Sequence, residues 1–69
     1  MMARGTRYYI VIYIDGEYDS TLVFNGVSVE DVKNQFRNTL VYQIISYEVS
    51  GIARILNERY VELETMYIE

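Results

Sequence analysis

The 69-residue sequence contains no His, no Cys, no Trp and no Pro. His is the usual general base near neutral pH, and Cys and His are the usual zinc ligands, so their absence excludes most compact catalytic sites. Without Cys there are no disulfides. We therefore expect a protein that is not an enzyme and has no catalytic residues, no metal site and no cofactor.

The short length predicts one domain, residues 1–69. A domain of this size buries only about 60% of its surface on folding, and small domains are often stabilised by disulfides, a structural metal or a partner subunit. Hydrophobic residues make up 51% of the chain, which is more than a lone small core easily hides. With disulfides and a zinc site excluded, self-association is the remaining way to stabilise a domain of this size, so we expect a homodimer.

The sequence shows no pattern that directs the chain into or across a membrane. It has no signal-peptide pattern, and its longest apolar run, 8–14, is far shorter than the ~20 residues that span a bilayer. The lack of Cys fits a reducing compartment. We therefore expect a cytoplasmic protein, in the host cytoplasm if a phage encodes it. The net charge of −4 disfavours direct nucleic-acid binding and permits a basic protein partner.

Two strands and a helix are predicted in the first half of the chain. Residues 7–15 are rich in Tyr, Ile and Val and end at Asp15-Gly16, a hairpin signal, after which 20–25 reads as the returning strand. Ser28 is a good helix N-cap, with Asp31 completing a capping-box-like pattern. The helix that follows has one apolar stripe, formed by Val29, Val32, Phe36 and Leu40.

The second half is predicted to add two more strands. Residues 43–50 are rich in Ile, Tyr and Val, and Gly51 is interpreted as a bulge or bend before 52–56. Residues 59–68 fit a strand better than a helix, although a helix over 52–68 remains open. The fold class is thus α+β: a two-layer, four-stranded antiparallel sheet (β-β-α-β-β) with one helix packed on one face.

One face of this sheet is predicted to be left uncovered. Side chains alternate along a strand, so the first strand has one face of Tyr8, Ile10, Ile12 and Ile14 and another of Tyr9, Val11 and Tyr13. The isoleucine face suits the helix. The tyrosine face is then a candidate surface for a dimer or another partner; alternatively, it lies under the C-terminal segment or is partly wet.

Three sets of charged residues are candidates for chemistry. Asp15, Glu17 and Asp19 alternate as hard-cation ligands do, but a solvated hairpin turn is favoured. Glu62 and Glu64 would share one strand face, where a charged outer surface is favoured over an acid–base pair. Lys33 and Arg37 form a minimal basic patch, which is read as a solvated helix face.

The order of elements resembles small phage-encoded inhibitor proteins of the uracil-DNA glycosylase inhibitor and anti-CRISPR types. The segments that carry this likeness are the hairpin 8–24, the turn and helix start 25–31, and the predicted strand 43–49, about two-thirds of the chain. Because the likeness is one of layout alone, it assigns no functional residue in this chain. The resemblance implies a cytosolic, often dimeric protein without catalytic activity.

The leading hypothesis is a non-catalytic protein–protein interaction module, of the kind that a phage or mobile element uses to inhibit a nucleic-acid-processing enzyme. Its predicted interaction surface comprises Tyr9, Val11, Tyr13, Asp15, Glu17 and Asp19. The acids would stand in for phosphates in a basic groove. The alternative is a nucleic-acid-binding protein in which Tyr8, Tyr9 or Tyr13 stack on bases and Arg4, Arg7, Lys33 and Arg37 contact phosphates.

Overall fold

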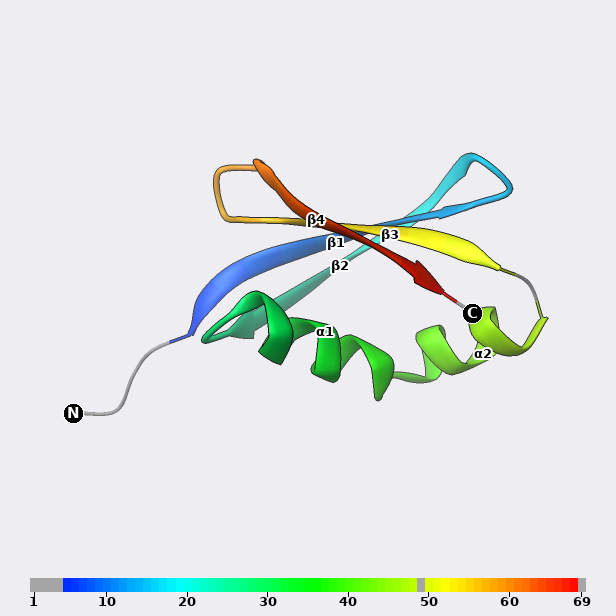
Figure 1. Cartoon of the computed structure of the whole chain (residues 1–69), viewed down its shortest axis with the longest axis horizontal. Coiled ribbons are helices and arrows are strands. Elements are labelled where there is room, and N and C mark those ends of the chain that lie inside the picture. Colours follow the sequence, from blue (N-terminus) through cyan, green and yellow to red (C-terminus); the bar gives the residue numbers. More distant parts are fainter. Residues whose placement is uncertain (1–4, 49, 69) are drawn as a thin grey trace.

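A computed structural model of the chain describes residues 5–48 and 50–68 (Figure 1). It contains four strands and two helices, in the order β1 (Thr6–Ile14), β2 (Glu17–Gly26), α1 (Val29–Arg37), α2 (Leu40–Glu48), β3 (Gly51–Leu56) and β4 (Glu62–Ile68). The strands form one antiparallel sheet in the order β2-β1-β3-β4. Both helices lie along the same face of this sheet (Figure 1). The predicted α+β fold class is confirmed, with one more helix than expected.

The β1–β2 hairpin forms where Asp15-Gly16 predicted it. Asp15 and Gly16 both have positive φ, at 54° and 79°. A two-residue hairpin turn needs this left-handed backbone at both positions, and Asp and Gly adopt it most readily. The pairing then runs from Ile14↔Glu17 to Thr6↔Gly26, with one bulge next to Tyr13.

Helix α1 begins as its sequence predicted. The Ser28 hydroxyl accepts a hydrogen bond from the Asp31 amide at 3.1 Å, and the Asp31 carboxylate accepts one from the Val27 amide at 2.9 Å. The two side chains thereby satisfy backbone donors at the helix start. Gly26 lets the helix lie this close to β2, because a Cβ there would come within 2.5 Å of a Val32 methyl group.

The predicted strand over 43–50 is wrong, because residues 40–48 form helix α2. The chain turns at Asn38, which caps the end of α1, and Thr39 starts the next helix by accepting a hydrogen bond from the Tyr42 amide at 3.1 Å. This break also corrects the predicted α1 stripe: Leu40 belongs to α2, and its side chain is exposed.

The C-terminal segment forms the hairpin β3–β4, so the strand interpretation of 59–68 is confirmed for residues 62–68. Asn57 organises its turn, since the Asn57 carboxamide oxygen accepts hydrogen bonds from the Arg59 and Val61 amides at 2.8 and 3.0 Å. A bulge between Ile55 and Leu56 shifts the register of the pairing with β4.

The core lies between the sheet and the helices. As predicted, Ile10 and Ile12 of β1 face the helices, where they are fully buried with Val32 and Phe36 of α1. The other buried hydrophobic residues are Ile45, Ala53, Ile55, Met66 and Ile68. With both helices on this side, the opposite sheet face carries no helix (Figure 1).

Candidate interaction surface

The sheet face opposite the helices is the candidate functional site, and we call it the open face. Tyr9, Val11 and Tyr13 form its central row, as the sequence predicted. In β2 the residues paired with Tyr9 and Tyr13 are Val23 and Tyr18. On the other side of β1 the same two tyrosines pair with Leu56 and Ile52. Because paired residues point to the same side of a sheet, all these side chains belong to the open face.

The β3 and β4 side of the open face was not assigned from the sequence. It adds Arg54, which pairs with Val11 and with Thr65, and Tyr67, which pairs with Ile52. Tyr67 is 67% exposed. The sequence of β3 does contain a signal for its part of the open face. Its outward residues Ile52, Arg54 and Leu56 alternate with the inward residues Gly51, Ala53 and Ile55.

At one end of the open face, Tyr60 of the β3–β4 turn stacks on Tyr9, with ring centroids 4.8 Å apart and planes 25° from parallel. Tyr60 has a φ of 65°, a left-handed backbone that is unusual for a bulky residue. The Tyr60 hydroxyl, and next the Arg7 guanidinium, lower the pKa of Tyr9. Hydrogen bonding to Tyr9 in turn raises the pKa values of Tyr60 and Arg7.

At the centre, Arg54 lies over Tyr13, with its guanidinium carbon 5.1 Å from the ring centroid. The Arg54 side chain also pairs with Glu62 of β4 at 3.4 Å. Tyr18 packs edge-on against the other side of Tyr13, with centroids 6.3 Å apart. The middle of the open face is therefore aromatic, with one arginine whose charge is matched by a neighbouring carboxylate.

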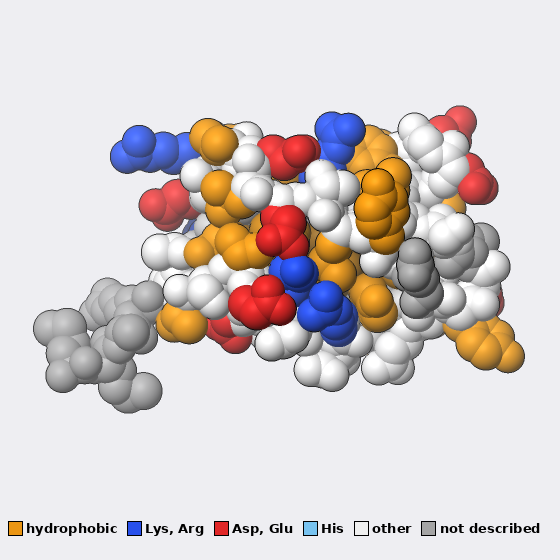
Figure 2. All heavy atoms as spheres, in the orientation of Figure 1, with side chains coloured by type: hydrophobic (Ala, Val, Ile, Leu, Met, Phe, Trp, Pro, Cys, Tyr) orange, Lys and Arg blue, Asp and Glu red, His pale blue; other side chains and the backbone are white. Residues whose placement is uncertain are grey.

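The two ends of the open face differ in charge. The acidic end is the β1–β2 hairpin with Asp15, Glu17 and Asp19. Glu17 pairs with Ile14, which packs against the core, so its side chain lies on the helix side of the hairpin and not on the open face, where the sequence predicted it. None of the three carboxylates forms an ion pair with a Lys or Arg described in the structure. On the side in view, Figure 2 shows acidic side chains and no basic ones at this end of the molecule. The basic end lies at the β3–β4 turn, where Arg7 and Arg59 line a hollow of about 640 Å³ together with Tyr9, Asn25 and Glu58.

A second hollow, of about 320 Å³, lies at the acidic end. Its apolar lining comes from Tyr13, Ile52 and Tyr67, and Asp15 and Gly16 of the hairpin turn border it. The open face thus carries a hollow with two arginines at one end and an apolar hollow beside the carboxylates at the other.

Helix α2 forms a separate exposed apolar surface. Leu40, Ile44 and Tyr47 are spaced by four and three residues, which places them on one side of the helix. All three are exposed, and Tyr47 is 92% exposed. The inward side is held by Ile45 in the core and by Tyr42, whose ring packs edge-on against Phe36 at 5.2 Å.

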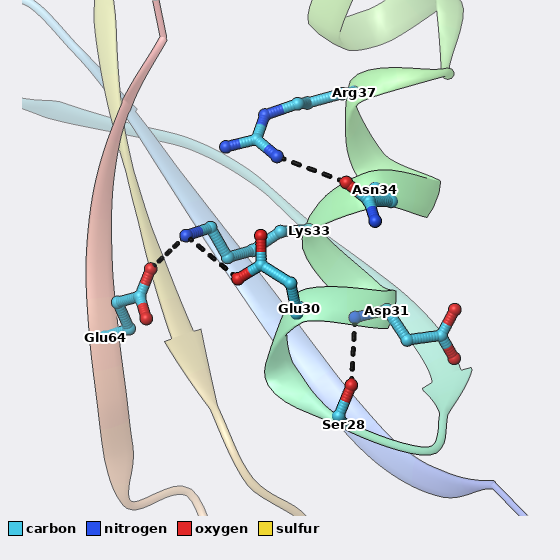
Figure 3. A network of polar contacts seen from close by, with 7 residues as sticks. All are labelled: Ser28, Glu30, Asp31, Lys33, Asn34, Arg37 and Glu64. Carbon is cyan, nitrogen blue, oxygen red and sulfur yellow. Dashed lines mark hydrogen bonds and ion pairs between the residues drawn. The ribbon is translucent and has the colours of Figure 1, made fainter.

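The two carboxylates weighed as an acid–base pair do not share a face. Glu64 pairs with Lys33 of α1 on the helix side (Figure 3). Glu62 instead pairs with Arg54 on the open face. The cause is the bulge, which makes Ile55 pair with Glu64 and Leu56 pair with Glu62. The predicted shared strand face is therefore wrong.

The predicted basic patch on α1 is also corrected. The Lys33 side chain is only 14% exposed, because it points to the sheet and pairs with Glu64 at 2.5 Å and Glu30 at 3.6 Å. Arg37 is exposed and hydrogen-bonds to Asn34 (Figure 3). Both residues belong to the helix layer, away from Tyr9 and Tyr13, and Arg4 of the nucleic-acid hypothesis lies outside the described residues.

Within residues 5–48 and 50–68, no group of three or more carboxylates is arranged to hold a metal ion. In the same residues, neither helix is long and apolar enough to cross a membrane. Comparisons of the chain with protein-family models, curated proteins and solved structures gave no match.

Proposed function

We propose that the protein is a non-catalytic protein–protein interaction module and that the open face is its contact surface. The observation that carries this proposal is the contrast between the two faces of one sheet. The inner face is covered by both helices (Figure 1). The other face exposes large apolar and aromatic side chains at both ends, among them Tyr18, Val23, Ile52, Tyr60 and Tyr67. A sheet face in water is normally polar, and contiguous exposed apolar surfaces mark interaction sites.

The side chains on this face suit protein contact. Tyrosine provides a large apolar area with few rotatable bonds and a hydroxyl that tolerates water, and tyrosine and arginine are enriched where interfaces gain most of their binding energy. Tyr13 with Arg54 above it places both residue types at the centre of the surface. The separation of Glu62 from Glu64 onto opposite faces also supports a role by contact.

Inhibition of a nucleic-acid-processing enzyme stays a prediction from the sequence. The acidic end supports it, because Asp15, Glu17 and Asp19 lie beside the aromatic surface, where they could enter a basic groove. Direct nucleic-acid binding is less well supported. Among the basic residues that this alternative assigns to phosphate contacts and that the structure describes, only Arg7 lies near the tyrosines of the open face, next to Tyr9.

A binding experiment with paired variants tests the proposal. The open-face variant Tyr13→Ser with Tyr67→Ser removes one half-buried and one exposed tyrosine from the open face, and the control Leu40→Ser with Ile44→Ser removes two exposed apolar side chains from α2. Each immobilised variant is exposed to cell extract and, separately, to the free protein, after circular dichroism has verified its fold. We expect the open-face variant to lose the ligand that the wild type and the control retain. Equal retention by all three proteins would refute the proposal.

A further inference from the structure

We propose that the occupant of the open face is a second copy of the chain, packed face to face with its strands antiparallel to those of the first. The inference rests on the proposed function, since it takes the open face as the contact surface. It is carried by the charge distribution along that face. Arg7 and Arg59 line the hollow at one end together with Glu58, which leaves that end with a net positive charge. The β1–β2 hairpin at the other end is acidic: Asp15 borders the second hollow, Asp19 follows Tyr18, and Glu17 is on the helix side of the same hairpin.

The strand register shows that these charges are at opposite ends of the same strands. Arg7 pairs with Asn25 near the start of β1, whereas Ile14 at the end of β1 pairs with Glu17 across the hairpin turn. In β3 the same polarity holds, because Leu56 precedes the turn with Arg59, and Gly51 starts beside Ile14. Figure 1 shows the β1–β2 and β3–β4 turns at opposite ends of the sheet.

A two-fold axis lying between two open faces has two simple orientations. An axis along the strands places each end on the same end of the other copy, so that carboxylates meet carboxylates. An axis across the strands exchanges the ends and places the basic end of each copy over the acidic end of the other. Opposite charges attract and like charges cost energy, so the second orientation is favoured. Sheets packed face to face with their strands nearly aligned are a common arrangement.

The same axis also matches the two hollows. Because it keeps each strand over its counterpart, Arg7 of β1 comes over the β1–β2 turn of the second copy. Tyr60 of the β3–β4 turn comes over the end of β3 and β4, where Tyr13, Ile52 and Tyr67 line the apolar hollow. Arg54 lies near the axis, where its pairing with Glu62 leaves the centre without net charge.

Three proteins test this arrangement by sedimentation equilibrium, with folding verified by circular dichroism. The first is the wild type. The second reverses the basic end with Arg7→Glu and Arg59→Glu. The third reverses the acidic end with Glu17→Lys and Asp19→Lys and carries Asp15→Asn, because Asn tolerates the left-handed backbone that Asp15 adopts.

We expect the wild type to form a dimer that weakens as salt is added. Each reversed variant alone should show a dimer dissociation constant raised by roughly tenfold or more, since like charges then meet at both ends. An equimolar mixture of the two variants should restore a dimer at least as tight as that of the wild type. If a variant fails to fold, the salt dependence of the wild-type dimer dissociation constant still tests the arrangement.

A wild type that remains a monomer at roughly millimolar concentration would overturn the inference. The proposed function would survive that result if the Tyr13→Ser, Tyr67→Ser variant still lost a foreign partner. A dimer that persists in that variant and disappears with Leu40→Ser and Ile44→Ser would place the contact on α2 and would also overturn the inference. Failure of the equimolar mixture to restore the dimer would also overturn the inference.

Discussion

The ring of Tyr60 stacks on the ring of Tyr9, and in this arrangement the Tyr60 backbone has a φ of 65°. Asn57 holds this turn, since its carbonyl oxygen accepts a hydrogen bond from the Tyr60 amide at 2.9 Å. A bulky residue in a left-handed conformation persists only where its surroundings favour it. Here the favourable contact is with the open face, and the strained residue is itself part of that face.

The backbone strain at Tyr60 predicts an unusual order of stabilities. Both Tyr60→Gly and Tyr60→Ala remove the stacked ring, but only Gly adopts the left-handed backbone without steric cost. We expect the Gly variant to be more stable than the Ala variant by about 1 kcal/mol, measured by urea unfolding. At Asn57, Gly and Ala should both lower the stability, because either substitution removes the side chain that supports the turn. Equal stability of the two Tyr60 variants would mean that the turn relaxes.

The titration of Tyr9 provides a second prediction. Its pKa lies below 10.0 in the folded chain, chiefly because of the Tyr60 hydroxyl and then because of Arg7. Since the folded pKa of Tyr9 is lowered, its ionisation favours the fold above pH 10 and contributes nothing at neutral pH, whereas the raised pKa of its partner Tyr60 acts in the opposite direction above pH 10. Tyr60→Phe keeps the ring and removes the hydroxyl, so the pKa of Tyr9 should rise towards 10.0, as followed by NMR of its ring protons. An unchanged pKa would contradict the assigned cause.

The hairpin and α1 were predictable because their signals are local. Asp15-Gly16 specifies a tight turn by itself, and Ser28 with Asp31 specifies a helix start by itself. Helix α2 was missed because its residues Val41, Tyr42, Ile44 and Ile45 suit a strand on propensity alone. What favours the helix is tertiary packing, with Ile45 entering the core and Tyr42 packing on Phe36. Thr39 as an N-cap was the sequence signal for its start.

The β4 side of the open face could not be predicted for a related reason. The row Tyr9, Val11 and Tyr13 follows from alternation within one uninterrupted strand. Between β3 and β4 the bulge next to Leu56 shifts the phase of that alternation, which sends Glu62 and Glu64 to opposite faces. A bulge of this kind arises from the pairing of two strands, so the sequence of β4 alone does not reveal it.

The ion pair between α1 and β4 predicts a pH-dependent stability. Hydrogen bonding to Glu64 raises the pKa of Lys33 above 10.5, its ordinary value. While Glu64 is ionised, as at neutral pH, the contribution of the pair is therefore fully present up to about pH 10.5 and is lost as the pH rises through the folded pKa of Lys33. Lys33→Met keeps the buried chain and removes the charge. The variant should unfold at lower urea concentration than the wild type, with a difference that is constant up to pH 10.5 and shrinks above it.

Arg37→Met is the matched control for that series. Arg37 is an exposed cation on the same helix, and its guanidinium donates a hydrogen bond to the Asn34 side chain at 3.3 Å. Its removal should change stability by less than about 0.5 kcal/mol, as is usual for exposed surface positions. If both variants lost the same stability with the same pH profile, the general charge of the helix, and not the pair with Glu64, would be responsible.

The cap of α1 predicts a loss that a conservative substitution prevents. Ser28→Ala removes the hydroxyl that accepts a hydrogen bond from the Asp31 amide, so the free energy of unfolding should fall by about 1 kcal/mol. Ser28→Asn supplies another acceptor at the same position and should retain most of that stability. Chemical denaturation of the three proteins measures both differences. A Ser28→Asn variant as unstable as Ser28→Ala would assign the loss to something other than the cap.

The proposed dimer distinguishes the two exposed apolar surfaces, the open face and the outer side of α2. Face-to-face packing of the open faces leaves the outer side of α2 in water, where Ile44 is 55% exposed. On an exposed helix side, Ala is the better helix former, so Ile44→Ala should raise the stability by a few tenths of a kcal/mol and leave the dimer unchanged. Val23→Ala, on the open face, is its counterpart and should weaken the dimer, since Val23 is 56% exposed in the single chain and would be covered. Dimer dissociation constants and urea unfolding measured on both variants check this, and weakening by Ile44→Ala alone would contradict it.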